Sequence, residues 1–425
     1  MLKKLLLRHV GPTEVMDFTF ASRLNLLTGD NSLGKTFVLD AVWWVLTGNW
    51  AKLPALPRHR ILRDVSKNTH PSDLSQIHYT LKTKPLTETI TQFDPKKQGW
   101  KSENRPLMLG LVIYARADGG FSVWDSARNN TIPSQNLEQT KRPNAFHFSN
   151  QTVWDGLSKG NQIVSNGLLQ DWLRWQSREI EVFEILTTVL AELSPPGDLI
   201  QPGEKTVRLS LEDVRDIPTL RLSYGDVPLV HVSAGIRRII GLAYMMVWAW
   251  SEHLKASEIL EQAPTPQMVL LLDEVEAHLH PHWQRSILPA ILRVVHHLRE
   301  DMAVQVIAGT HAPLILASVE PQFNPETDRL FHFYFDKHNV KVECVRWTKH
   351  GDATGWLISE VFGLKQARSL EAEKAIDAAT RLMRSGAVAH DKKYIVYQQL
   401  INTLPPEDPF WPRWIMYEEK QKRLL

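Results

Sequence analysis

The sequence predicts an α/β fold built on a mixed sheet, and three widely separated segments support this prediction. Residues 23–48 read as a buried strand, a glycine-containing loop and an apolar helix that stops near Gly48. Residues 267–274, QMVLLLDE, contain five consecutive apolar residues followed by two carboxylates. Residues 302–313, MAVQVIAGTHAP, form a third strand-like run. Apolar strands of this kind are typical of a parallel sheet that is covered on both faces.

The loop of the first segment, TGDNSLGKT at residues 28–36, matches the phosphate-loop pattern Gly-x4-Gly-Lys-[Ser/Thr]. Backbone N–H groups of such a loop, together with the start of the following helix, form a cradle for phosphate groups. In this pattern the lysine reaches the β- and γ-phosphates and the Ser/Thr hydroxyl binds Mg²⁺. An ordinary glycine turn is the alternative, and the flanking strand and helix argue against it. We therefore expect a nucleotide to be bound by Gly29, Asn31, Ser32, Leu33, Gly34, Lys35 and Thr36.

The carboxylates of the second segment fit the same site. Charged side chains rarely end a buried strand without a partner, although a solvated strand end is the alternative. Asp273 is placed to bind Mg²⁺ together with Thr36. Glu274 is one residue further on and points elsewhere, so we expect it to orient the attacking water.

Two further segments are ambiguous when each is considered alone. A histidine after a buried strand is more often structural, but beside the first two motifs we expect His311 to donate a hydrogen bond to a γ-phosphate. In HVSAGIRRIIGLAYMMVWAW, residues 231–250, Ser233 is a good N-cap for an apolar helix. The N–H groups at Ser233 and Gly235 are suited to bind phosphate, but the segment is equally well explained as a simple helix start.

Composition limits the classes of function. With 49 basic and 47 acidic residues the net charge is +2, so nucleic-acid binding is not indicated by charge, although a local basic patch is compatible with it. Cys344 is the single cysteine, which excludes an intrachain disulfide framework and a multi-cysteine zinc site. The longest apolar run, residues 239–250, is shorter than the roughly 20 residues that span a bilayer. We expect a buried helix there, no membrane association and a cytoplasmic protein.

Taken in order, these four segments resemble those of ABC-type ATPases, in particular the branch that contains SMC, RecF and OLD-family proteins. Residues 2–36 look like the N-terminal strands of that branch running into its phosphate loop. LLLDEVEAHLHPHWQ, residues 270–284, is close to the OLD-like run Asp-Glu-x-Glu-x-x-Leu-His-Pro, and VSAGIRRI, residues 232–239, occupies the place of the signature motif. The resemblance covers about residues 1–50 and 220–360.

The resemblance implies a P-loop NTPase fold, an ABC-type ATPase head that binds ATP and Mg²⁺ and hydrolyses ATP. It also implies a homodimer in which two protomers sandwich two nucleotides, each phosphate loop facing Ser233–Gly235 of the other. Such ATPases are typically paired with a separate nuclease or toxin in bacterial anti-phage defence. The ATPase subunits of the PARIS system come first among those that the sequence resembles, and those of the Septu system second. A TOPRIM or HNH nuclease is a fitting effector, because the chain shows no such pattern of its own.

The sequence departs from the family pattern at three places. Ser32 and Leu33 stand where relatives often carry Gly-Ser or Gly-Ala, and only the outer glycines are essential for the turn. Ile236 and Arg237 stand where transporters have glutamine, which puts individual contacts of the signature segment in doubt. Gln151 is a candidate for the glutamine that senses Mg²⁺, without further support.

We expect four parts: residues 1–50 and 221–365 as the two halves of the ATPase head, 51–220 as an insertion or lid, and 366–425 as a helical tail. The insertion shows no sustained heptad, so it is expected to be compact and α+β, not a long coiled coil. Strands are expected at about 75–130 and helices at about 165–195. The six tryptophans between Gly48 and Arg221 favour core packing over base stacking. A metal site is a less favoured interpretation of His278, His280 and His282 than the family motif.

Two other functions are compatible with these residues. One is a RecF-like DNA-repair ATPase that acts directly on DNA, for which salt-dependent DNA binding that stimulates hydrolysis would be the sign. The other is a scaffold that binds ATP tightly with negligible turnover.

Overall fold

The computed structural model describes residues 1–58, 75–82, 86–100, 109–129, 145–337, 339–385 and 390–424. These residues separate into two compact units, Met1–Gly351 and Asp352–Leu425, and each is considered by itself below. The second unit begins upstream of residue 366, where the sequence places the helical tail.

The first unit is built around an eight-stranded mixed sheet with the order β18-β17-β3-β16-β15-β7-β8-β9. The five strands from β17 to β7 are parallel, and β18, β8 and β9 extend the sheet by antiparallel pairing. In chain order the strands are β3 (Leu24–Gly29), β7 (Leu111–Ala115), β8 (Phe121–Asp125), β9 (Phe146–Phe148), β15 (Gln267–Asp273), β16 (Ala303–Gly309), β17 (Asp328–Asp336) and β18 (Asn339–Val345). All residues of β3 are buried, as expected for a strand covered on both faces. The predicted mixed α/β sheet is therefore confirmed.

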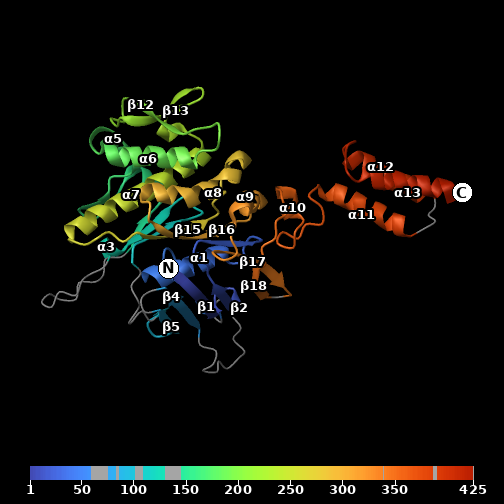
Figure 1. The fold of residues 1–425 in the computed structure, drawn as a ribbon, viewed down its shortest axis with the longest axis horizontal. Helices are drawn as coiled ribbons and strands as arrows, with labels where there is room; N and C mark the ends of the chain where they lie inside the picture. Colours follow the sequence, from blue (N-terminus) through green and yellow to red (C-terminus); the bar gives the residue numbers. More distant parts are fainter. Residues whose placement is uncertain are drawn as a thin grey trace. The chain divides into compact units, whose positions relative to one another are not determined.

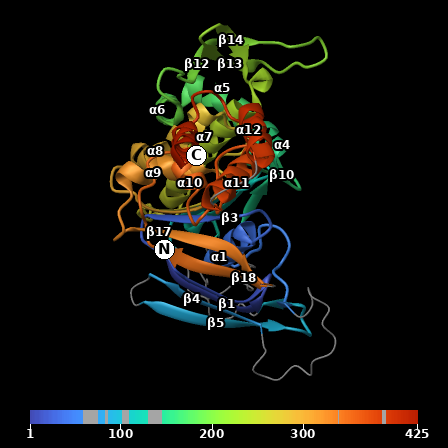
Figure 2. The same ribbon diagram turned by 90° about the vertical axis from the view of Figure 1, so that its right-hand side faces the viewer.

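Helix α1 (Lys35–Thr47) lies between this sheet and a second, antiparallel sheet, as Figures 1 and 2 show. The second sheet has the order β2-β1-β4-β5-β6. Its strands are β1 (Leu2–Val10), β2 (Thr13–Thr19), β4 (Gln76–Leu81), β5 (Thr87–Asp94) and β6 (Gly99–Trp100). Side chains of both sheets and of α1 form one continuous apolar core, which explains why α1 is buried on nearly every side. Gly48 ends the helix in the left-handed conformation, with φ 79°.

The other face of the central sheet is covered by α7 (Ala234–Ile259) and α8 (Pro281–Leu298), with α5 (Leu168–Arg178) and α6 (Ile180–Leu193) outside them (Figure 1). Residues 239–250 of α7 are all buried, which confirms the expected buried helix. None of the helices in the described part of the chain combines the length and hydropathy that crossing a bilayer requires. A small antiparallel sheet is formed by β12 (Gln201–Val207), β13 (Ile217–Leu222) and β14 (Gly225–Pro228).

Short elements connect these parts: α3 (Ser126–Asn129), α4 (Asn150–Asp155), β10 (Leu157–Lys159), β11 (Gln162–Ser165), the 3-10 helices η2 (Leu229–His231) and η3 (Glu320–Gln322), and α9 (Pro313–Val319). The second unit contains α10 (Ala353–Leu357), α11 (Leu370–Arg384), α12 (His390–Thr403) and α13 (Trp411–Leu424). The last three helices share an apolar core of their own.

Residues 51–220 are divided among several parts of the first unit. Strands β4 to β6 extend the antiparallel sheet, β7 to β9 extend the central sheet, and α5 and α6 contact each other and α7 or α8. Within the described residues, strands at 75–130 and helices at 165–195 are confirmed. Five of the six tryptophans, Trp100, Trp124, Trp154, Trp172 and Trp175, are buried, and Trp50 stacks on Trp44, so core packing is confirmed as well. A lid role for this segment stays a prediction.

Candidate nucleotide-binding site

The predicted phosphate loop connects the carboxyl end of β3 to the first residue of α1. Gly29 has φ 139°, and a Cβ atom there would lie 2.2 Å from the carbonyl oxygen of Phe333 on the neighbouring strand β17. Gly34 has φ 96° and directly precedes the helix. Since side chains other than glycine are strained at such angles, both glycines of the motif are required by the backbone. Ser32 also adopts a left-handed conformation, with φ 65°.

Lys35 is buried, with 6% of its surface exposed, and folds back over the loop. Its Nζ donates hydrogen bonds to the carbonyl oxygens of Gly29 (2.7 Å) and Asp30 (2.9 Å). Burial lowers the pKa of Lys35, and the nearby carboxylates, foremost Glu274 and Glu276, oppose this effect. A bound phosphate would supply the negative charge that a partly desolvated ammonium group favours.

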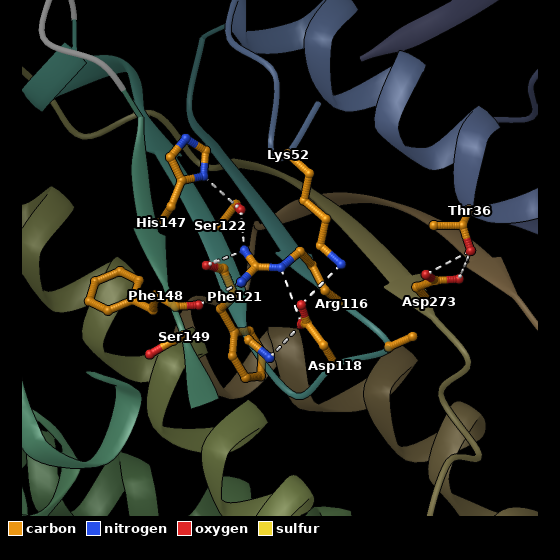
Figure 3. Close-up of polar contacts among 12 residues, drawn as sticks. Thr36, Lys52, Arg116, Asp118, Phe121, Ser122, His147, Phe148, Ser149 and Asp273 are labelled. Atoms are coloured by element: carbon orange, nitrogen blue, oxygen red, sulfur yellow. Dashed lines mark hydrogen bonds and ion pairs between the residues drawn. The ribbon is translucent and has the colours of Figure 1, made fainter. Parts of the chain in front are cut away.

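Thr36 and Asp273 meet although 237 positions separate them in the chain. The Thr36 hydroxyl donates to the carboxylate of Asp273, with distances of 3.1 Å to Oδ1 and 2.9 Å to Oδ2 (Figure 3). Burial raises the pKa of Asp273, and the hydrogen bond from Thr36 lowers it. A hydroxyl and a carboxylate are oxygen ligands of the kind that Mg²⁺ prefers, so the two residues fit the predicted metal role.

Glu274 follows the last residue of β15 and leaves the strand direction abruptly. Its φ is 51°, a left-handed conformation that few non-glycine residues adopt. Its N–H donates to the carbonyl oxygen of Gly309, at the end of the neighbouring strand β16, at 3.0 Å. The structure therefore brings Lys35, Thr36, Asp273 and Glu274 to the same edge of the sheet.

His311 lies just after β16 and contacts Glu276, a residue to which the sequence analysis assigned no role. The Glu276 carboxylate accepts a hydrogen bond from the backbone N–H of His311 at 2.8 Å and lies 3.3 Å from its ring Nδ1. Its second oxygen is buried and has no hydrogen-bond partner in the described part of the chain. The spacing Asp-Glu-x-Glu was the available signal for Glu276. The contact of His311 with a γ-phosphate stays a prediction.

Ser233 and Gly235 lie at the start of α7. The Ser233 hydroxyl accepts a hydrogen bond from the N–H of Ile236 at 3.4 Å, which confirms its role as N-cap. Both residues line a cavity of about 660 Å³ that also includes His278, His280 and His282, and its lining contains neither a phosphate-loop residue nor Asp273. Within the described residues, His, Cys, Asp and Glu side chains form no group of three or more arranged to hold a metal ion.

Gln151 lies in the first turn of α4, and its side chain is exposed. Its neighbour Asn150, not Gln151, lines a cavity of about 240 Å³ together with Asp273. The Mg²⁺-sensing role of Gln151 therefore stays a prediction without a contact to support it.

A second group of charged side chains surrounds the metal-site carboxylate. Asp40 lies one helical turn after Thr36, and burial raises its pKa to about 6 although Tyr114 donates a hydrogen bond to it. Asp118 forms ion pairs with Lys52 at 3.0 Å and with Arg116 at 3.3 Å (Figure 3). No sequence pattern pointed to Lys52, Arg116 or Asp118; Asp40 had a signal, because residues four apart share a helix face, as Asp40 does with Thr36.

Comparisons with known proteins found similar families, sequences and structures. Residues 199–317 match the protein family described as "AAA domain, putative AbiEii toxin, Type IV TA system". Septu protein PtuA of Bacillus thuringiensis is 20% identical over 420 residues, which cover 96% of this chain and 95% of that protein. The "Retron Ec83 probable ATPase" of Escherichia coli is 24% identical over 98 residues, 23% of this chain and 15% of that protein. The SMC head domain from Thermotoga maritima is a similar solved structure, with 15% identity, a TM-score of 0.39, and coverage of 81% of this chain and 99% of that one.

The similarity to a Septu protein extends over nearly the whole chain, and it concerns the second of the two defence systems that the sequence resembles. With the phosphate-loop pattern, the strand-end carboxylates and the sheet order that joins them, this chain resembles ABC-type ATPases, and its similarity to Septu protein PtuA is a resemblance to the ATPase subunits of anti-phage defence.

Proposed function

We propose that this chain binds ATP with Mg²⁺, hydrolyses it, and acts as a nucleotide-controlled sensor or switch in bacterial anti-phage defence. The observation that carries the ATPase part is the meeting of Thr36 and Asp273 beside the buried Lys35. The near full-length similarity to Septu protein PtuA supports the defence part.

The residues of the loop and strand ends divide the chemistry between them. Lys35 and the loop N–H groups bind the phosphates, while Thr36 and Asp273 would hold Mg²⁺, which neutralises phosphate charge when bound. Glu274 accepts a hydrogen bond from the attacking water and orients it toward the γ-phosphate. His311, held by Glu276, donates to the same phosphate group.

The proposed active unit is a dimer in which each phosphate loop faces Ser233–Gly235 of the second subunit. Ser233 and Gly235 line a cavity whose lining includes no phosphate-loop residue, which is compatible with their meeting a nucleotide held by another subunit. ATP then stabilises the closed dimer through its γ-phosphate, and hydrolysis removes that bridge. The dimer holds a separate effector, a nuclease of TOPRIM or HNH type or a toxin, and releases it when the nucleotide state changes.

Two substitutions test the ATPase part, with ATP binding and phosphate release measured on each purified variant. Lys35→Ala should abolish ATP binding, because the loop loses its cation. Glu274→Gln should bind ATP like the wild type, while turnover falls by about 100-fold or more, as expected for loss of the carboxylate that accepts the hydrogen bond from the attacking water. Glu212→Gln, an exposed position in the 208–216 loop, is the control and should change neither quantity.

Other outcomes would support the rival functions. Tight ATP binding by the wild type, with turnover no faster than that of Glu274→Gln, would indicate an ATP-bound scaffold. Hydrolysis stimulated by DNA, with binding that weakens steeply as salt rises, would indicate a RecF-like ATPase.

A further inference from the structure

Arg238 connects the start of α7 to the end of β15. It lies five residues after Ser233, and its Nη2 donates hydrogen bonds to the carbonyl oxygens of Asp273 and Glu274, both at 2.9 Å. Its Nη1 lies 3.4 Å from the carbonyl oxygen of Ala117, in the turn between β7 and β8. One guanidinium group therefore joins three segments at the carboxyl edge of the central sheet.

These contacts are made to backbone carbonyls although carboxylates are close by. The charges of Glu276, Asp273, Glu274 and Asp118 all act on the guanidinium, yet its hydrogen bonds go to the main chain. A planar guanidinium presents its donors in a fixed fork, so a pair of adjacent carbonyls is held in a defined geometry. The two carbonyls belong to the residue predicted to hold Mg²⁺ and the residue predicted to orient water.

The backbone at Glu274 needs such restraint. A left-handed conformation at a non-glycine residue costs about 1 kcal/mol or more and persists only where the surroundings enforce it. The N–H of Glu274 is held by Gly309, and its carbonyl is held by Arg238 and by the N–H of Ala277. Of these three partners, Arg238 is the one that belongs to α7, and it binds through its side chain.

Packing alone does not provide this restraint. Arg238 and Asp273 line the cavity of about 240 Å³, together with residues of α4, α7 and α8. Without the guanidinium, the carbonyl oxygen of Asp273 would lose the hydrogen bond from Arg238, that of Glu274 would keep the N–H of Ala277, and the connection of both to α7 would be lost.

We propose that Arg238 is a positioning residue that couples the start of α7 to the backbone of Asp273 and Glu274. When a second subunit's nucleotide engages Ser233–Gly235, the shift of α7 is passed through Arg238 to the backbone of Glu274, so hydrolysis proceeds efficiently only in the closed dimer. This inference rests on the proposed function, since it requires ATP hydrolysis at a dimer interface.

The test compares Arg238→Gln, Arg238→Lys and a matched control, Arg128→Gln. Arg128 is also partly buried and packs on α7, 5.3 Å from the ring of Trp248, but it does not line the cavity beside Asp273. ATP affinity, kcat, KM and the dependence of turnover on protein concentration are measured for each. ATP-dependent dimerisation is measured separately with each substitution combined with Glu274→Gln.

Arg238→Gln is expected to keep ATP affinity, KM and ATP-dependent dimerisation within about threefold of the wild type. Its kcat should fall by about 10- to 100-fold, as for a small misplacement of a catalytic group. Its turnover per subunit should no longer rise with protein concentration. Arg238→Lys should recover part of the loss, because an ammonium group can bind one carbonyl at a time. Arg128→Gln should keep the wild-type concentration dependence.

Wild-type kcat and concentration dependence in Arg238→Gln would overturn the inference and leave the proposed ATPase intact. Loss of ATP binding or of folded protein to the same degree in Arg238→Gln and Arg238→Lys would assign Arg238 a purely structural role, which also overturns it. An absence of turnover in the wild type would instead contradict the proposed function itself.

Discussion

At the residue scale, the carboxylates near Thr36 differ in their hydrogen-bond partners and in their pKa because their surroundings differ. Asp273 accepts two contacts from the Thr36 hydroxyl, and Glu276 is linked to His311. Asp40 lies on the same face of α1 as Thr36, and one of its buried carboxylate oxygens has no hydrogen-bond partner among the described residues. Burial raises the pKa of Asp40 to about 6, and the nearby charge of Asp273 adds to this effect.

The raised pKa of Asp40 predicts a pH dependence of stability. Between its ordinary value of 3.8 and about 6, the folded protein keeps a proton that the unfolded chain has lost. The corresponding stabilisation is fully present below about pH 4 and is lost as pH rises through 6. Asp40→Asn should therefore be more stable than the wild type at pH 7.5, by roughly 1 kcal/mol after allowance for solvent screening.

Urea unfolding without nucleotide or Mg²⁺, at pH 4.5 and pH 7.5, measures this difference. The gain from Asp40→Asn should fall to about a third at the lower pH, whereas the exposed Asp17→Asn should change little at either. An equal gain at both pH values would contradict the assignment to Asp40 ionisation.

At the scale of elements, helix α7 combines two roles at one end. Its first turn is capped by Ser233, and the same turn faces the cavity that the proposed second subunit would occupy. Its long buried middle section fixes the helix against the central sheet, since α7 contacts β7 and β8. The N-cap role and the proposed phosphate contact of Ser233 can be tested separately, because a carboxylate can cap the helix but would repel a phosphate.

Two substitutions at Ser233 distinguish these roles. Aspartate is as good an N-cap as serine and interacts favourably with the helix dipole, so Ser233→Asp should keep stability within a few tenths of a kcal/mol. Ser233→Ala should lose about 1 kcal/mol. In the proposed dimer, however, the aspartate charge would repel the γ-phosphate of the second subunit's nucleotide.

Ser233→Asp combined with Glu274→Gln should therefore bind ATP and fail to dimerise, as measured by light scattering after size-exclusion chromatography with and without ATP. Glu274→Gln alone is the control and should dimerise with ATP. Undiminished dimerisation of the Ser233→Asp combination would exclude this residue from the interface.

At the scale of the whole molecule, the chain contains two units with separate apolar cores. The core of the second unit is formed by α11, α12 and α13 around Trp414, which is 1% exposed. The phosphate loop, the strand-end carboxylates and Arg238 all lie in the first unit. Nucleotide binding should accordingly tolerate damage to the second unit.

Trp414→Ala tests this separation. Truncating a buried tryptophan costs about 3–5 kcal/mol, which is enough to unfold a small helical unit. Calorimetry should show loss or a large downward shift of one transition, while ATP affinity stays at the wild-type value. Met416→Ala on the same helix is the control, because Met416 is 71% exposed. A parallel loss of ATP affinity in Trp414→Ala would show that the units are energetically coupled.

Local sequence patterns were sufficient to predict much of the fold and some of the residues at the candidate site. The phosphate loop, the buried strand ending at Asp273 and the N-cap at Ser233 each depend on residues within a few positions of one another. The geometry of glycine, apolar runs and helix caps is encoded at that range, so the sequence predicted them correctly. It could not predict that residues 51–220 supply strands to both sheets, because strand pairing depends on partners far away in the chain.

By itself, the sequence determined which residues form the glycine loop predicted to bind phosphate and which buried strands end in carboxylates. Only the tertiary structure decided that Glu276 holds His311, that Asp40 lies desolvated near Asp273, and that Arg238 binds the backbone of Glu274. The physical reason is that burial, pKa shifts and long-range hydrogen bonds belong to the assembled edge of the sheet. These properties cannot be read from any single segment, because each depends on contacts between segments that are far apart in the chain.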